Sequence, residues 1–308
     1  EDEASRGVES LEELEKVFAW HVARSAGGER HVQDAATFDA LLRGLERLER
    51  ARFTLGGNSA IMADVLVRDW GFQNVLLGGP IGERVEQLLP KELDTIGSKT
   101  DEVHLILEYE HGLRWGSAEA KRANRFIISR DEANSRVEGV EEVTSNVQGF
   151  DLLIVAGLHM LDGAATGFRK QRLGEIKASL DRVDRDTRIH FELASIGDVE
   201  VLREVAREVV PRVDSLGLNE QELLALWVAL GGKDSENVAQ MHPNLSAVRV
   251  VLLGLFEAFP RLERVHFHSF AVHVIAQRGG RAWRWPHQEA ATAAGSVKAS
   301  ERASPCKK

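Results

Sequence analysis

The residues of this sequence that could do chemistry lie in two short segments. In RIHFELAS, residues 188–195, His190 and Glu192 are two positions apart; in SLGLNEQE, residues 215–222, Asn219 precedes Glu222 by three positions. Alternate side chains of a strand share a face, so His190 and Glu192 point away from Phe191. A carboxylate inside an apolar strand of a covered sheet needs a partner or a cation. Both segments are therefore candidates for a metal or phosphate site.

Helix capping gives a simpler explanation of the second segment. Asn is a strong N-cap, and a Glu at the third helical position can accept a hydrogen bond from the backbone N–H of the cap. Glu220 and Glu222 also suit the positive end of a helix dipole. If the strands before these segments are neighbours, however, Glu192 and Glu222 converge through a βαβ unit near helix N-termini that favour phosphate, which predicts a Mg²⁺–phosphate site. Both interpretations stay open.

The turn Gly56-Gly57-Asn58 is a third candidate. Two glycines let the backbone come close to a ligand, and Asn58 can cap the following helix while offering its amide to a hydroxyl group. Alone, such a turn is a weak signal, because turn and cap chemistry explains it without a ligand.

Composition limits the class of protein. A chain of 308 residues, 43% hydrophobic and 28% charged, can form one large α/β domain or a domain plus a smaller one. A net charge of -9 without a basic stripe argues against nucleic acid as the main partner. The single cysteine, Cys306, allows no intrachain disulfide. We expect no transmembrane segment, because no apolar run approaches the ~20 residues that a membrane helix needs. No signal peptide is visible in a chain that begins at Glu1.

An alternation of strands and helices must position the candidate residues. Strands alternating with helices of these lengths predict an α/β fold with a mostly parallel sheet covered by helices on both faces. The expected helices are 9–24, 37–51, one through Trp70, one in PIGERVEQLL, 168–183, 198–209, one opened by Asn219, and 245–259. The expected strands are a short one ending in LGGNSA, NVLLGG, 150–157, 188–195, 213–218, and one strand in RVHFHSFAVHVIA.

Residues 103–130 interrupt this alternation. VHLILEY, residues 103–109, and RFIIS, residues 125–129, read as short strands with no long helix between them, which predicts a small β-rich lid. Residues 1–102 and 131–277 then form the large α/β domain. The Ala-, Arg- and Ser-rich residues 278–308 lack a sustained period and predict an irregular tail.

Six segments together resemble the ADP-dependent glucokinase family, in its eukaryotic branch, within the ribokinase-like superfamily. They are GGN (56–58), LILEY (105–109), NRFI (124–127), GLHM (157–160), HFELAS (190–195) and SLGLNEQE (215–222). The ordered H-x-E and N-x-x-E pair is specific, and the similarity runs from about residue 10 to about residue 300. The resemblance implies a ribokinase-like fold. It also implies phosphoryl transfer from ADP to the 6-hydroxyl of glucose, giving glucose 6-phosphate and AMP, with Mg²⁺.

The resemblance also implies roles for individual residues. Glu192 and Glu222 would organise Mg²⁺ and its waters, with His190 and Asn219 in support. The substrate-binding residues would be Gly57 and Asn58 in the sugar site, Glu108 on the lid strand, Arg125 near sugar or phosphate, and His159 in the sugar pocket.

The sequence departs from the family pattern in two places. Such kinases use a G-x-G-D sequence near the C-terminus, whose Asp takes the proton from the sugar hydroxyl and whose glycines bind the transferred phosphoryl group; no G-x-G-D occurs here. The family's first strand, with a sugar-binding Asp, is also missing before the opening helices. We therefore assign no catalytic residue and expect the chain alone to be inactive, because phosphoryl transfer depends on positioning and electrostatic stabilisation.

Two alternatives to an ADP-dependent glucokinase remain. One is a non-catalytic regulatory protein that binds sugar or metal, and the other is an ATP-dependent ribokinase-like sugar kinase. We expect a monomer. Animal relatives are associated with the endoplasmic reticulum, so the expected compartment is that organelle or the cytoplasm.

Overall fold

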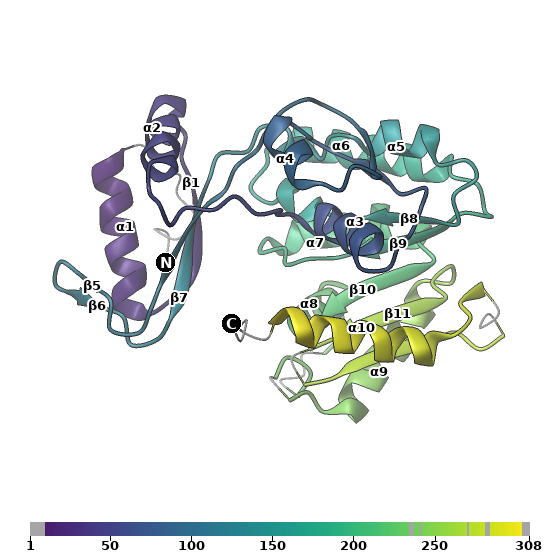
Figure 1. Cartoon of the computed structure of the whole chain (residues 1–308). Helices are drawn as coiled ribbons and strands as arrows, with labels where there is room; N and C mark the ends of the chain where they lie inside the picture. Colours follow the sequence, from purple (N-terminus) through teal and green to yellow (C-terminus); the bar gives the residue numbers. More distant parts are fainter. Residues whose placement is uncertain (1–9, 234–236, 241, 270, 281–283, 304–308) are drawn as a thin grey trace. The chain divides into compact units, whose positions relative to one another are not determined.

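The computed structural model describes residues 10–233, 237–240, 242–269, 271–280 and 284–303 (Figure 1). Cys306 lies outside the described residues. The chain divides into two compact units. Unit 1 takes its described residues from Glu1–Leu55, Pro80–Leu88 and Lys99–Asn134, and unit 2 takes them from Gly56–Gly79, Leu89–Ser98 and Ser135–Lys308. Among the described residues, no helix combines the length and the apolar character needed to cross a membrane.

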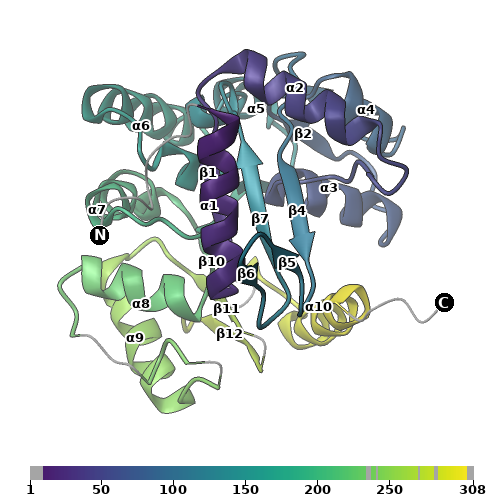
Figure 2. The ribbon, with the colours of Figure 1, turned by 90° about the vertical axis from the view of Figure 1, so that its left-hand side faces the viewer.

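Unit 1 is built on a three-stranded sheet in the order β1-β7-β4. β1 (Gly28–His31) runs parallel to β7 (Asn124–Ser129), and β7 runs antiparallel to β4 (Leu105–Tyr109). Two helices, α1 (Leu11–Arg24) and α2 (Ala35–Glu46), lie beside this sheet (Figure 2). The unit also contains α4 (Glu83–Leu88) and a small hairpin of β5 (Arg114–Trp115) and β6 (Ala118–Glu119).

The opening helices belong to unit 1, whereas the sequence pattern assigns them to the large domain. Their apolar residues Leu14, Phe18 and Phe38 are buried in one cluster with Phe126 and Ile128 of β7. The sequence pattern did not predict β1, because its sequence GERH is short and charged and gives no strand signal. Because β1 pairs with β7, the segment that follows α1 is tied to the strands of residues 103–130, and the helices cover the apolar side of that sheet.

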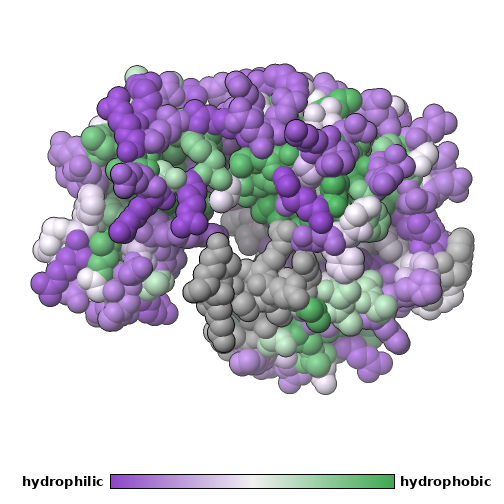
Figure 3. Space-filling model, in the orientation of Figure 1, coloured by the Kyte–Doolittle hydropathy of each residue, from purple (hydrophilic) through white to green (hydrophobic). Residues whose placement is uncertain are grey.

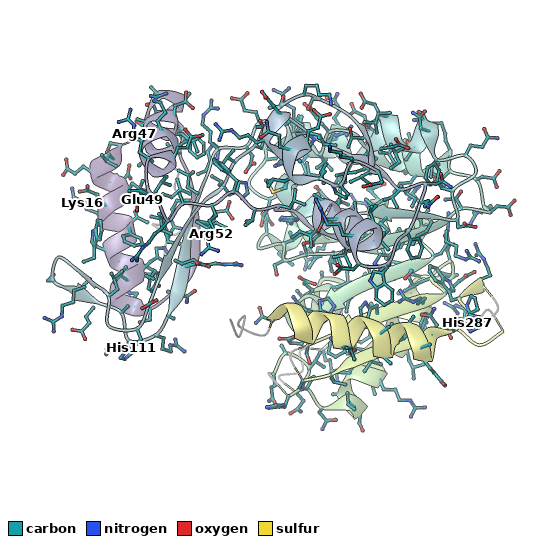
Figure 4. All side chains as sticks on the ribbon, in the orientation of Figure 1. Lys16, Arg47, Glu49, Arg52, His111 and His287 are labelled. Carbon is teal, nitrogen blue, oxygen red and sulfur yellow. The ribbon has the colours of Figure 1, made fainter. Side chains whose placement is uncertain are left out.

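The surface of unit 1 is polar where its helices meet water. On the face shown in Figure 3 this unit is mostly hydrophilic. Lys16, labelled on α1 in Figure 4, forms an ion pair with Glu12 across 2.6 Å, one turn away. α1 therefore has one apolar side, which packs on the sheet, and one charged side.

An acidic cluster surrounds the imidazole of His104 in unit 1. His104 Nε2 donates to Asp131 Oδ2 at 2.8 Å, and Nδ1 lies 4.0 Å from Glu29 Oε1. The carboxylate of Glu102 accepts hydrogen bonds from the backbone N–H groups of residues 132, 133 and 134. Burial lowers the pKa of His104. The hydrogen bond and charge of Asp131, with the charges of Glu29 and Glu102, raise it by more, so the net pKa is above the ordinary value.

Unit 2 is built on a five-stranded sheet in the order β12-β11-β10-β9-β8. The four strands β8 (Leu152–Val155), β9 (Arg188–Glu192), β10 (Ser215–Asn219) and β11 (Arg264–His268) are parallel. β12 (His273–Gln277) is antiparallel to β11. The prediction of an α/β fold with a mostly parallel sheet is confirmed. The single strand expected in RVHFHSFAVHVIA is instead two strands, joined by a turn in which the N–H of Ser269 donates to the carbonyl of Val272 at 2.9 Å.

Helices and the sheet together form the core of unit 2. The core is one cluster of buried apolar residues that includes Ile189, Phe191, Leu216, Leu218 and Phe267 of the sheet. The contributing helices include α6 (Thr166–Asp181), α7 (Val199–Glu208), α8 (Glu220–Ala229) and α9 (Leu245–Ala258). α5 (Val140–Asn146) packs beside α6.

A two-stranded parallel sheet, β2 (Leu76–Gly78) and β3 (Asp94–Ile96), and α3 (Asn58–Arg68) complete this part of unit 2. The strand in NVLLGG is therefore present as β2. The short strand expected to end in LGGNSA is not: residues 51–56 are irregular. Among the described residues no strand pairs with this segment, so Phe53 and Leu55 are not held in a sheet.

The tail contains a helix where the sequence pattern indicated irregular structure. α10 (Gln288–Ala303), the yellow helix in Figure 1, follows a segment anchored to the sheet and contacts β12. Trp285 Nε1 donates to Glu263 Oε2 at 3.2 Å, and Gln288 Oε1 accepts from Arg264 Nε at 2.7 Å. The guanidinium carbons of Arg188 and Arg264 lie 5.6 and 5.3 Å from the centre of the Trp285 ring. These tertiary contacts fix the start of a helix that has no strong apolar period of its own.

Candidate functional site

One face of the unit 2 sheet is polar because every second residue of three adjacent strands is polar or glycine. We call this face the polar face and define it by His190, Glu192, Ser215, Gly217, Asn219, Arg264, His266 and His268. The residues between them, such as Phe191 and Leu218, are fully buried in the core. β9 and β10 are neighbours, with Gly217 opposite Glu192. The condition for Glu192 and Glu222 to converge is therefore met.

Glu192 lies on the polar face with only 14% of its side chain exposed. Its Oε2 is 3.3 Å from His190 Nε2. Burial raises the pKa of Glu192. The hydrogen bond and charge of His190, with the charges of His268 and His266, lower it by more, so the net pKa is below the ordinary value. Glu192 is therefore an ionised carboxylate in a nearly dry environment.

Glu222 and Asn219 form a reciprocal capping box at the start of α8. Asn219 Oδ1 accepts from the N–H of Glu222, Glu222 Oε2 accepts from the N–H of Asn219, and Ser195 Oγ donates to Glu222 Oε1 at 3.3 Å. The capping interpretation is thus correct as geometry. The carboxylate is also buried, because Glu222 is only 8% exposed.

The two carboxylates interact electrostatically. Burial raises the pKa of Glu222, the backbone hydrogen bond from Asn219 lowers it, and the charge of Glu192 raises it again, with a net increase. Two nearly buried carboxylates that repel one another suit a divalent cation, because hard oxygen ligands are those that Mg²⁺ prefers and its charge would relieve the repulsion. The donor set of this pair therefore fits Mg²⁺ held directly or through water.

A row of histidines on β11 and β12 was missed by the sequence analysis. The ring centres of His266, His268 and His273 lie 5.4 to 6.1 Å from one another, and His266 Nε2 is 3.3 Å from His273 Nδ1. Burial lowers the pKa of His266 to about 3, aided by the charges of His268 and Arg264. The signal was present in RVHFH, whose alternation repeats that of RIHFE in β9.

The residues predicted for a sugar site fall in both units. Gly57 is the N-cap of α3 with φ of 75°, so Asn58 is the first helical residue rather than the cap. His159 lies in η2 (Leu158–Leu161), a 3₁₀ turn soon after β8. In unit 1, Glu108 of β4 and Arg125 of β7 are exposed and directly opposite one another in the antiparallel pair. Their roles stay predictions.

Comparison with known proteins shows the family to which the chain belongs. The family described as "ADP-specific Phosphofructokinase/Glucokinase conserved region" matches residues 1–308. ADP-dependent glucokinase of Bos taurus is 32% identical over 314 residues, covering 96% of this chain and 62% of the relative. Probable ADP-dependent glucokinase of Caenorhabditis elegans is 31% identical over 309 residues, covering 94% of this chain and 61% of the relative.

A solved structure shares the fold. The crystal structure of a hypothetical ADP-dependent phosphofructokinase from Pyrococcus horikoshii OT3 superimposes with a TM-score of 0.67 and 17% sequence identity, covering 87% of this chain and 65% of that one. The chain thus spans about three fifths of the length of the curated relatives that it matches. The match over its full length places it in the family of ADP-specific phosphofructokinases and glucokinases.

Proposed function

We propose that this chain is part of an ADP-dependent sugar kinase that transfers a phosphoryl group from ADP to the 6-hydroxyl of glucose, giving glucose 6-phosphate and AMP. Glucose as acceptor is supported by the two relatives named as ADP-dependent glucokinases. The observation that carries the proposal is the pair of nearly buried carboxylates, Glu192 and Glu222, at the carboxyl ends of β9 and β10, where open parallel sheets bind their ligands.

Each residue has a definite task in this proposal. Glu192 and Glu222 hold Mg²⁺, which neutralises charge on the phosphates when bound. Asn219 fixes the Glu222 carboxylate through two hydrogen bonds of 2.9 Å, from its backbone N–H and from Nδ2. The N-terminus of α8 adds a positive dipole end next to the pair, which favours a phosphate there. Gly57, Asn58, His159, Glu108 and Arg125 are the residues proposed to contact the sugar or phosphate.

The chain alone is proposed to be inactive. Its 308 residues contain no G-x-G-D sequence to supply the base and the anion-binding glycines. Losing one preorganised donor to a transition-state charge costs on the order of 10²-fold or more in rate.

A coupled assay for glucose 6-phosphate tests the proposal. The 308-residue chain and a longer form extended at both ends are assayed with glucose and either ADP or ATP. We expect turnover only from the longer form, only with ADP, and a large loss in its Glu192→Gln variant. Turnover with ATP alone would replace the proposal with an ATP-dependent kinase. A longer form that binds glucose without turnover would favour the regulatory protein.

A further inference from the structure

The carboxylate of Glu192 lies over β10, the middle strand of the unit 2 sheet. Glu192 and Gly217 are paired in register, and a Cβ atom built on Gly217 would come within 2.0 Å of Glu192 Oε2 and 3.1 Å of His190 Cε1. Gly217 shows no positive φ, so its backbone conformation does not require glycine. The reason for glycine at this position is therefore the space that the carboxylate occupies, because any larger residue would displace Glu192.

Ser215, the other residue of β10 beside this pair, controls the orientation of His190. Its hydroxyl is fully buried, lies 2.9 Å from His190 Nδ1, and accepts from Arg264 Nη1 at 2.8 Å. His190 Nε2 faces an ionised carboxylate and must therefore carry a proton. The hydrogen bond between His190 Nδ1 and the Ser215 hydroxyl fixes the orientation of the ring, while Arg264 donates to a lone pair of the serine oxygen.

Arg264 holds the Ser215 hydroxyl in place from the other side. A guanidinium donates hydrogen bonds and accepts none. Burial lowers the pKa of Arg264 to about 10, which leaves it charged at neutral pH. Its second contact, from Nε to Gln288 Oε1 at 2.7 Å, holds the side chain in place. A chain of hydrogen bonds therefore connects Arg264, Ser215, His190 and Glu192.

We propose that Ser215 and Gly217 are positioning residues for the Glu192 carboxylate in its role as a metal ligand. Gly217 leaves the space in which the carboxylate lies, and Ser215 fixes the orientation of the His190 ring that contacts the carboxylate. This proposal rests on the proposed function, because it assigns the two residues to the same metal site. Neither residue is expected to contact the metal, so both act through Glu192.

Two matched controls separate positioning from packing. Gly78 of β2 has the same clash as Gly217, since a Cβ there would come within 2.0 Å of a carbon atom, Val143 Cγ2. Ser179 of α6 is as buried as Ser215 and accepts from an arginine, Arg182 Nη2, at 3.0 Å, and no hydrogen bond to a histidine is seen for it within the described residues. Gly78→Ala and Ser179→Ala therefore disturb the fold in the same way without touching Glu192.

The experiment is a titration of the 308-residue chain with Mn²⁺ as the probe, followed by electron paramagnetic resonance, with and without ADP. We expect Gly217→Ala and Ser215→Ala each to weaken Mn²⁺ binding by roughly tenfold or more, in the range found for residues that orient metal ligands. The two controls should keep the wild-type affinity. In a Glu192→Gln background, Gly217→Ala should add no further loss, because the group it displaces is already neutral.

The outcomes distinguish the two proposals. Wild-type Mn²⁺ affinity in Gly217→Ala and Ser215→Ala would overturn the positioning role while leaving the metal site intact. Equal losses in the test and control variants would overturn it as well, because packing alone would explain them. A wild-type chain that binds no Mn²⁺ even with ADP would overturn the metal site of the proposed function, and the positioning role with it. If Gly217→Ala does not fold, Ser215→Ala decides the question.

Discussion

Asn219 and Glu222 each accept a hydrogen bond from the backbone N–H of the other, both at 2.9 Å, and so close the first turn of α8. Asn219 Oδ1 also accepts from the N–H of Gln221. Asn219→Ala should lower the free energy of unfolding by about 1–2 kcal/mol, as loss of a good N-cap does. Urea denaturation measures this change.

A second capped helix provides the control for Asn219. Asn244 caps α9 by accepting from the N–H groups of Ser246 and Ala247. Asn244→Ala should cost a similar free energy of unfolding but leave Mn²⁺ affinity unchanged, whereas Asn219→Ala should weaken it because Glu222 loses its hydrogen bond from Nδ2. Equal Mn²⁺ affinity in the two variants would contradict this role of Asn219.

Glu222→Gln separates helix capping from metal binding. A capping box accepts Gln in place of Glu, so the free energy of unfolding should change by no more than roughly 1 kcal/mol. Loss of the Glu192–Glu222 repulsion would even offset part of the change. Mn²⁺ affinity should fall by about tenfold or more, because the negative charge itself is needed. Unchanged affinity would leave Glu222 with the capping role alone.

His104 should make the stability of unit 1 depend on pH. Its folded-state pKa is raised above the ordinary value of 6.5 by Asp131, Glu29 and Glu102. The stabilisation is therefore fully present below about pH 6.5 and is lost as pH rises through the folded-state pKa. The difference in thermal midpoint between wild type and His104→Gln should be larger at pH 6 than at pH 8.5. His111→Gln, at an exposed position after β4 labelled in Figure 4, is the control and should show no such difference. A difference independent of pH would show that packing alone explains the effect of His104.

Trp285 should be the residue that secures α10. Trp285→Ala removes the hydrogen bond to Glu263 and the contacts with the Arg188 and Arg264 guanidinium groups. We expect a loss of about 1–3 kcal/mol in the free energy of unfolding, and faster amide exchange in residues 288–297 than in α9. Trp285→Phe keeps a ring for the cations and should lose less. Equal exchange in all three proteins would mean that α10 is held by other contacts.

The sequence predicted the positions of Glu192, Asn219 and Glu222 better than the elements around them, and the roles of these residues stay predictions. Glu192, Asn219 and Glu222 were found because strand alternation and capping act over two or three residues, and these rules held in β9 and α8. Gly217 and Ser215 were not found. Their importance depends on which strand lies beside β10 and in which register, and local spacing carries no such information.

The sequence pattern also failed to predict three other elements. β1 is a strand only because β7 pairs with it, and β12 is separate from β11 because Ser269 forms a turn without a Gly or Pro signal. α10 depends on the anchoring of Trp285. A partner distant in sequence decides the local structure of β1 and α10, whereas β12 depends on the local turn at Ser269.

The pairing of β1 with β7 also dictates the order in which unit 1 can be completed during synthesis. Residues 28–31 lie beside residues 126–129, and β7 also pairs with β4, so β7 is the central strand of the three. An emerging chain has made α1, β1 and α2 long before it reaches β7. Their apolar residues Leu14, Phe18 and Phe38 then have no sheet to cover. Contacts this distant in sequence are slow to form. The core of unit 1 can therefore be completed only after β7 has been synthesised, however early α1 and α2 form.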